Sequence, residues 1–261
     1  MTTKRSITLT LTAALAASVL AFTCACSTGK DSSTSASGSA PTTELAPPAE
    51  GLSRVLWLGD SIADGLSLPL SFAFDAAKVE FSSIAAAGGG TVVGDLGKTT
   101  WETLDERLRT MKPSTVVYQV TTYDWGSSEE LERAYQRLVD AAGDAKVIFV
   151  TVPPIAADDF YAPHLEDLAR TTAAAQAVAE RSGGRAHVLD ASAVWGTSFT
   201  KTVDGKRYRS DDGIHTCPQG AARFTNWLLD GLSDVYPAFT PPAASKWANA
   251  GWASDKAFIG C

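Results

Sequence analysis

Five short apolar runs, separated by longer segments in which hydrophobic residues recur with a helical period, constrain the fold of this 261-residue chain most strongly. The runs are apolar at both odd and even positions, which is typical of strands covered on both faces. Strands that alternate with helices form parallel sheets through right-handed crossovers. We therefore predict a doubly wound α/β fold. Its strands are expected over 54–59, 78–84, 114–121, 146–152 and 186–190, and its helices over 101–111, 128–142, 165–182 and 218–232.

Ligands of such sheets bind at the carboxyl ends of the strands, so the loops at that edge form the candidate site. The first strand is followed by Gly59-Asp60-Ser61, and the second by three consecutive glycines at 88–90. The third and fourth strands are followed by TTYDWG and PPIAADDFYAP, and the fifth leads to SDDGIHTCPQG. Residue types suited to catalysis therefore gather on one predicted rim of the sheet.

Ser61 is a candidate nucleophile, because it follows a buried strand directly and stands beside a carboxylate. A serine hydroxyl needs a base that accepts its proton. Of the three histidines, His187 falls inside a predicted strand and His164 begins a predicted helix. Asp212 precedes His215 by three residues, and a carboxylate at that spacing on one loop can orient the imidazole ring. These residues favour a triad of Ser61, His215 and Asp212. The alternative is a helix cap at the serine and a simple turn at the aspartate.

The sequence GDS after the first strand, together with DGIH before the last helix, resembles the SGNH hydrolase superfamily, also called the GDSL esterases and lipases. The resemblance covers about residues 53–233. It implies a three-layer α/β/α, flavodoxin-like fold with a parallel five-stranded sheet. It also implies that Ser61 is the nucleophile, that Asp212 and His215 complete the triad, and that no cofactor is needed.

The same resemblance implies an oxyanion hole made by the amide of Ser61, a glycine amide of the second loop and an asparagine side chain of the third loop. Alignment on a Gly-x-Thr ending favours Gly89 as this glycine, with Gly88 and Gly90 as its neighbours. The asparagine position holds Tyr123, because this chain has TTYD where the family has Gly-x-Asn-Asp. A phenol donates one hydrogen bond but reaches differently from an amide. Three outcomes stay open: the phenol replaces the asparagine donor, the backbone amides suffice, or the site is weakened.

The first 26 residues have the basic start, apolar centre and small-residue end of an export signal. Their last residues, FTCAC, resemble the lipobox of bacterial lipoproteins, which implies lipidation at Cys26, with Cys24 as a second candidate. Residues 27–50 are rich in Ser, Thr, Ala and Pro, a composition expected of a flexible linker. We expect a protein anchored by lipid to the outer face of the cytoplasmic membrane. A secreted form and a retained spanning helix are the alternatives.

Two cysteines remain beyond the signal and the lipidation site, Cys217 and Cys261. In an oxidising compartment such a pair favours a disulfide, with two free thiols as the alternative.

The hydrolase domain is predicted over 51–236. Residues 237–261 are predicted to form a tail that packs back on the domain, because they contain several large aromatic residues.

The formal net charge is −7, and no basic cluster is interleaved with aromatic residues, which argues against nucleic acid as a partner. The sequence has no metal-ligand spacing of His, Cys or acidic residues. We expect a monomer that acts on a small-molecule, glycan or lipid ester.

Two functions fit these observations. The first is an extracytoplasmic serine esterase or acyl hydrolase, acting on an ester such as an O-acyl group of an envelope glycan or lipid, with acyl transfer as a variant. The alternative is a non-catalytic envelope lipoprotein of the same fold that binds a glycan or a protein partner. Aromatic residues near the predicted rim either line a cleft or pack in the core: Trp125, Phe160, Tyr161 and Trp195.

Overall fold

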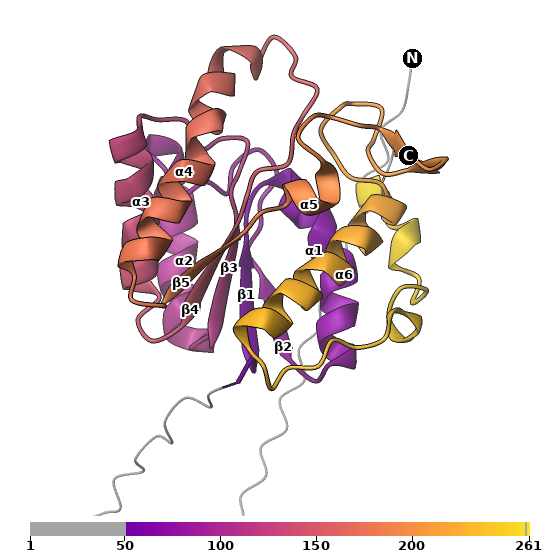
Figure 1. Cartoon of the computed structure of the whole chain (residues 1–261), viewed down its shortest axis with the longest axis horizontal. Helices are drawn as coiled ribbons and strands as arrows, with labels where there is room; N and C mark the ends of the chain where they lie inside the picture. The colour runs from indigo at the N-terminus through magenta and orange to yellow at the C-terminus, as the bar shows by residue number, and fades with distance from the viewer. Residues whose placement is uncertain (1–50, 259) are drawn as a thin grey trace, which may run out of the picture. The chain divides into compact units, whose positions relative to one another are not determined.

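A five-stranded parallel sheet forms the centre of the computed structural model, which describes residues 51–258, 260 and 261. The strand order is β2-β1-β3-β4-β5, the flavodoxin-like order, and every neighbouring pair is parallel. The predicted fold class is therefore confirmed (Figure 1). The strands are β1 Arg54–Leu58, β2 Glu80–Ser83, β3 Thr115–Gln119, β4 Lys146–Val150 and β5 Ala186–Leu189.

Helices cover both faces of the sheet and complete the three layers. One face carries α1 (Ser61–Ala76) and α6 (Pro218–Val235). The other carries α2 (Lys98–Met111), α3 (Ser128–Ala141) and α4 (Leu165–Arg181) (Figure 1). Side chains of β1 alternate between the two layers: Val55 and Trp57 join the core beneath the first face, and Leu56 and Leu58 join the other. This alternation explains why the strand is apolar at every position from 55 to 58.

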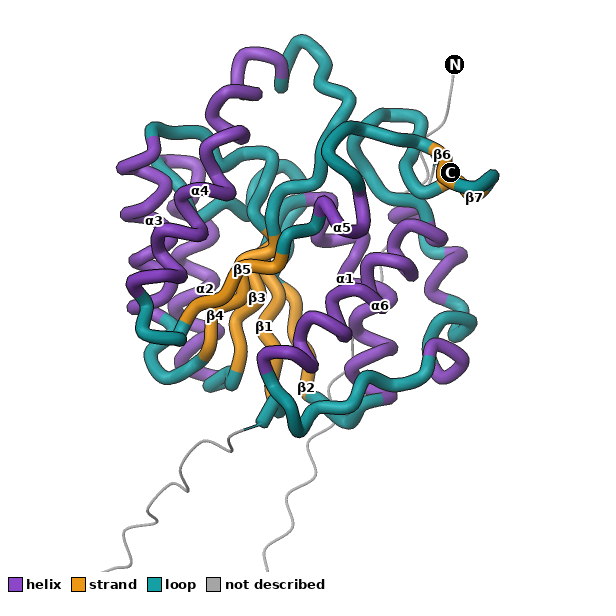
Figure 2. The backbone as a smooth tube through the Cα atoms, viewed as in Figure 1, coloured by secondary structure: helices purple, strands orange, loops and turns teal. Residues whose placement is uncertain are grey.

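Several short elements were not predicted. They include α5 (Ser192–Trp195) and a hairpin of β6 (Thr202–Val203) and β7 (Lys206–Arg207) (Figure 2). The others are single 3₁₀ turns at Asp95–Gly97, Ala162–His164, Ala244–Lys246, Trp252–Ser254 and Lys256–Phe258. Elements this short contain too few residues for a periodic hydrophobic pattern, so tertiary contacts fix them.

The C-terminal residues pack against the α1 and α6 layer. Trp247, Trp252 and Phe258 are buried in the same core as these helices. The expected disulfide between Cys217 and Cys261 is present and closes a sequence separation of 44 residues. It joins the last residue of the chain to the start of α6.

The predicted export signal over 1–26, the lipidation site Cys26 and the linker over 27–50 lie outside the described residues. Within the described part of the chain, no helix combines the length and the apolar character that crossing a bilayer requires.

Candidate active site

Ser61 is the first residue of α1 and lies at the carboxyl end of the central strand β1. Asp60 caps the helix, because its Oδ1 accepts a hydrogen bond of 2.9 Å from the amide of Ile62. Gly59 has a φ of +151°, and a Cβ atom there would lie 2.4 Å from the Cβ of Ala63. The tight turn from strand to helix therefore needs a glycine. It presents the serine hydroxyl beside the switch point of the sheet, where the strand order reverses between β1 and β3.

The structure brings the three predicted triad residues together. Ser61 Oγ lies 2.8 Å from His215 Nε2, although the two residues are 154 positions apart in the sequence. On the other side of the ring, Nδ1 lies 2.7 Å from Asp212 Oδ2. This places an imidazole between a hydroxyl and a carboxylate, with one ring nitrogen for each, as a serine-activating relay requires.

Backbone amides hold the Asp212 carboxylate in place. Its Oδ1 accepts hydrogen bonds from the amides of Ile214 at 2.8 Å and His215 at 2.9 Å. Desolvation acts to raise the pKa of Asp212, but the hydrogen bonds from the His215 ring and these amides outweigh it and lower the pKa to about 2. The aspartate is thus ionised at neutral pH and favours the tautomer in which Nδ1 carries the proton and Nε2 faces Ser61.

Arg209 supports the loop that carries His215, a role that the sequence did not indicate. Its side chain is 1 % exposed, and its guanidinium donates to the carbonyls of Pro154 at 3.0 Å and Ile214 at 2.5 Å. Desolvation lowers its pKa to about 10, opposed by the charges of Asp212 and Asp60. No sequence pattern separates this arginine from the exposed ones, because its burial depends on loops that are distant in sequence.

Asp60 joins the loop after β1 to the loop after β3. Its Oδ2 accepts hydrogen bonds of 2.8 Å from both the amide and the hydroxyl of Thr122. The side chain is fully buried, and desolvation raises its pKa against the effect of these hydrogen bonds. Ser61 follows Asp60, and Tyr123 follows Thr122. These hydrogen bonds therefore fix the position of Ser61 relative to Tyr123, the predicted oxyanion donor.

A second buried carboxylate, Asp124, ties the loop after β2 to the loop after β3. It accepts hydrogen bonds from four hydroxyl groups at 2.6–2.7 Å, those of Thr91, Thr121, Tyr118 and Tyr135. Desolvation raises its pKa, and the hydroxyl donors oppose the shift. Because Thr91 follows the triple glycine, this cluster fixes the loop in which Gly89 lies.

Gly89, one of the predicted oxyanion residues, lies in the loop after β2. The residue that follows it, Gly90, packs on the backbone beside Ser61. Gly90 has a φ of +78°, and a Cβ there would lie 1.9 Å from the carbonyl oxygen of Gly59. The Tyr123 hydroxyl accepts a hydrogen bond of 3.3 Å from Tyr161, which leaves its own proton available for donation. Burial is the largest of the causes that raise the pKa of Tyr123, so the phenol is protonated at neutral pH.

Tyr123 belongs to an aromatic cluster built from the loops after β3 and β4. Its ring lies 5.5 Å from Trp125, 6.2 Å from Phe160 and 6.0 Å from Tyr161 between centroids. His164 stacks on Trp125 at 3.6 Å. Phe160 is 54 % exposed, so the cluster presents an apolar surface to solvent. Trp195 is separate, because it is buried in the core and stacks on Phe224 at 5.9 Å.

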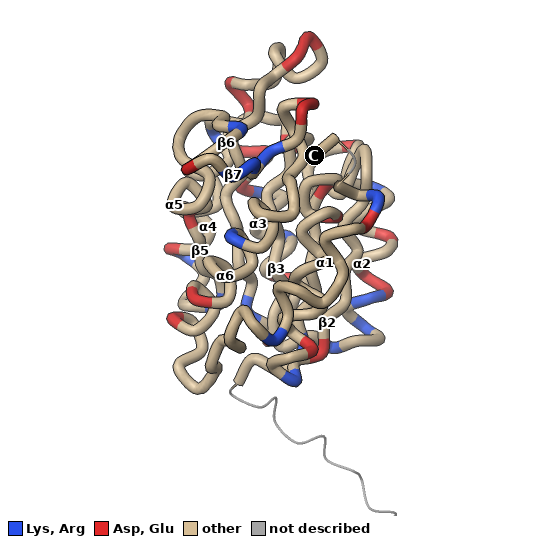
Figure 3. Tube along the Cα trace, turned by 90° about the vertical axis from the view of Figure 1, so that its right-hand side faces the viewer, with Lys and Arg blue, Asp and Glu red and all other residues tan. Residues whose placement is uncertain are grey.

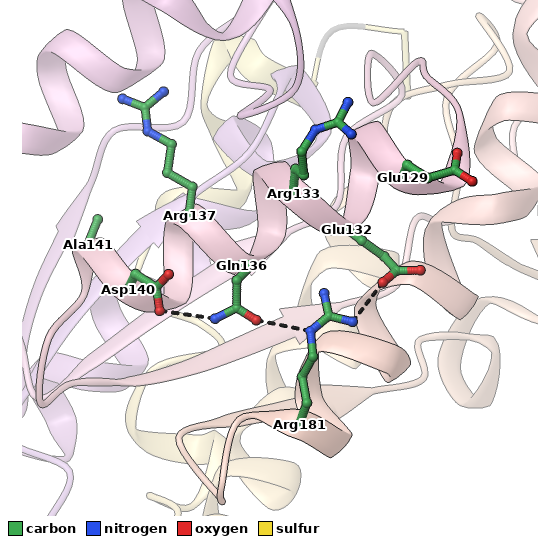
Figure 4. A pocket seen from close by; sticks show the side chains of 8 residues that line it. All are labelled: Glu129, Glu132, Arg133, Gln136, Arg137, Asp140, Ala141 and Arg181. Carbon is green, nitrogen blue, oxygen red and sulfur yellow. Dashed lines mark hydrogen bonds and ion pairs between the residues drawn. The ribbon is translucent and has the colours of Figure 1, made fainter.

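A small pocket of about 170 Å³ opens beside Ser61 and His215. A larger hollow of about 670 Å³ lies between α3 and α4, away from the triad (Figure 4). Across it, Arg181 donates hydrogen bonds to Glu132 at 2.6 Å and to Gln136 at 3.1 Å. Its lining contains no nucleophile or imidazole, so we assign the chemistry to the smaller pocket. Among the residues that the structure describes, no cluster of three or more His, Cys, Asp or Glu is arranged to hold a metal ion.

The fold and the site together define an α/β protein with a serine, histidine and aspartate constellation at the switch point of a flavodoxin-like sheet. Solved lipases and acylhydrolases share this fold. A lipase/acylhydrolase from Enterococcus faecalis is 17 % identical with a TM-score of 0.52, over 72 % of this chain and 98 % of the other. A GDSL-like lipase from Bacteroides thetaiotaomicron is 15 % identical with a TM-score of 0.50, over 73 % and 92 %. TesA is 18 % identical with a TM-score of 0.50, over 70 % and 99 %.

The chain therefore has the fold of the SGNH, or GDSL-type, hydrolases that its motifs resemble. No protein-family model matches the sequence, and no curated protein matches it significantly. At this level of identity the comparisons establish the fold, and the chemistry rests on the geometry of the chain's own residues.

Proposed function

We propose that this protein is a serine esterase that hydrolyses acyl esters. The observation that carries the proposal is the continuous contact from Ser61 Oγ through the His215 ring to Asp212, at 2.8 Å and 2.7 Å. A helix cap at Ser61 and a simple turn at Asp212 would not require an imidazole to bridge the two.

The reaction follows from these contacts. His215 Nε2 accepts the hydroxyl proton as Ser61 Oγ attacks the ester carbonyl carbon. The bond to the alcohol oxygen then breaks, the alcohol leaves with the proton from His215, and an acyl-serine remains. Water attacks this acyl group, again giving its proton to His215, which returns the proton to Ser61 as the acid is released. Asp212 stays ionised and stabilises the imidazolium in both steps.

The developing oxyanion needs donors placed before the reaction begins. The candidates are the amide of Ser61, the amide of Gly89 and the hydroxyl of Tyr123. Two contacts support the Gly89 amide and the Tyr123 hydroxyl, because they hold both donor loops beside the serine. Gly90 packs on the Gly59 backbone, and Thr122 donates hydrogen bonds to Asp60.

The substrate we propose is an O-acyl ester on a glycan or lipid of the cell envelope. Support comes from the predicted export signal and the lipobox-like sequence ending at Cys26, which would hold the domain at the outer face of the cytoplasmic membrane. Transfer of the acyl group to an acceptor hydroxyl would use the same acyl-serine. The exposed aromatic cluster around Phe160 suits either a sugar face or an apolar alcohol.

A non-catalytic binding role is the second candidate, and the tyrosine at the asparagine position favours it. The distinction can be tested by labelling the purified domain with a fluorophosphonate probe. The parent and the matched control Ser67→Ala, which removes a hydroxyl from the same helix, should both be labelled. Ser61→Ala and His215→Ala should not. A parent that is neither labelled nor able to hydrolyse short p-nitrophenyl esters would overturn the esterase proposal and favour the binding role.

A further inference from the structure

The pocket beside Ser61 has one wall from outside the α/β core. Helix α1 contributes Asp64 and Gly65, the loop after β2 contributes Ala87, and the C-terminal segment contributes Ala257. The nucleophile and His215 line the same space. Ala257, four positions before Cys261, therefore borders the site of chemistry.

Independent anchors fix this segment. The disulfide joins Cys261 to Cys217, two residues after His215. The guanidinium of Arg207 donates to the carbonyls of Gly260 at 2.7 Å and Cys261 at 3.0 Å. Figures 2 and 3 accordingly show the chain end beside the β6–β7 hairpin.

Closer to the pocket, buried aromatic residues hold Ala257 itself. Phe258 is 6 % exposed and packs on the buried Trp252 with 5.8 Å between ring centroids. The amide of Ala257 donates a hydrogen bond of 2.9 Å to the Asp255 side chain. The position of this wall is thus determined by the same core that holds α1.

The space that remains is small. The pocket beside Ser61 and His215 has a volume of about 170 Å³. Ligand sites for drug-sized molecules are usually about 300–1,000 Å³. The pocket is therefore smaller than a usual ligand site, which favours a short acyl group over a long acyl chain or a sugar ring.

We propose that Ala257 is a specificity-determining residue that borders the pocket beside Ser61 and makes the enzyme prefer short acyl groups. The inference rests on the proposed esterase function. In an O-acyl ester of a glycan or lipid the acyl group is the smaller part, so it is the part that we place in this small pocket. The larger alcohol lies on the open rim, where the aromatic cluster offers an apolar surface.

The test is a substrate profile of the full domain with p-nitrophenyl acetate, butyrate and octanoate. The parent should lose at least about 10-fold in kcat/KM from butyrate to octanoate. Ala257→Leu fills the pocket and should lower the rate on butyrate about 10-fold relative to acetate. The matched control is Ala253→Leu, another exposed alanine of this segment that does not line the pocket, and it should keep the parental profile.

A second series holds the acyl group as acetate and varies the alcohol. The inference is supported if Ala257→Leu changes the relative kcat/KM values across the acyl esters and leaves the relative values across the alcohols unchanged. It is overturned if the acyl profile matches the parent, or if only the alcohol series responds. Fluorophosphonate labelling of Ala257→Leu separates these outcomes from loss of the triad. A parent without labelling or hydrolysis would instead refute the esterase function, and this inference with it.

Discussion

Gly90→Ala tests how closely the second loop is fitted to the nucleophile. Gly90 and Gly88 lie in one loop with similar φ angles of +78° and +72°, a region that costs an alanine about 1–2 kcal/mol. They differ in their surroundings. A Cβ added at Gly90 would lie 1.9 Å from the Gly59 carbonyl oxygen, whereas a Cβ added at Gly88 would have no atom within 4 Å. A Cβ contact under 3.0 Å does not occur in real structures, so the backbone beside Ser61 must move by about 1 Å.

We therefore expect Gly88→Ala to lower the free energy of unfolding only by the cost of placing an alanine at a positive φ. Gly90→Ala should cost a further ~1–3 kcal/mol, which is typical of overpacking. It should also lower kcat about 100-fold, because a displacement of about 1 Å at reacting groups has an effect of that order. Urea unfolding and hydrolysis of p-nitrophenyl acetate measure the two quantities. Equal unfolding free energies and equal kcat values for the two variants would refute the reasoning.

Three further predictions concern the disulfide, the acid and the phenol. Replacing Cys217 and Cys261 by serine should lower the free energy of unfolding by about 4 kcal/mol, given a separation of 44 residues, and a loss below about 1 kcal/mol in urea would contradict this. Asp212 has a pKa lowered from 3.8 to about 2, so its contribution to stability is present above about pH 4 and is lost as the pH falls toward 2. The carboxylate is 43 % exposed, so screening limits this contribution to at most about 1 kcal/mol. The unfolding free energies of the parent and Asp212→Asn should therefore converge below pH 4, and a gap independent of pH would argue against the assigned interaction. Tyr123→Phe should lower kcat about 100-fold with little change in KM if the phenol donates to the oxyanion, and an unchanged kcat would remove it from that role.

The sequence by itself determined the fold class and most of the sheet. Hydrophobic periodicity is a local property, so all five strands and the four predicted helices formed within a few residues of the expected positions. The pairing of Asp212 with His215 was also predictable, because they stand three positions apart on one loop. The helix α1 was less evident, since Gly65 and Pro69 in its interior weaken its helical propensity.

Only the tertiary structure decided what surrounds these residues. The hydrogen bond of buried Arg209 to Pro154, that of Thr91 to Asp124 and the place of Ala257 beside Ser61 each join segments that are distant in the sequence. Their side chains have no periodic or spaced pattern before the chain folds. Burial and long-range hydrogen bonds depend on which surfaces meet across the completed sheet, and local sequence does not encode that choice.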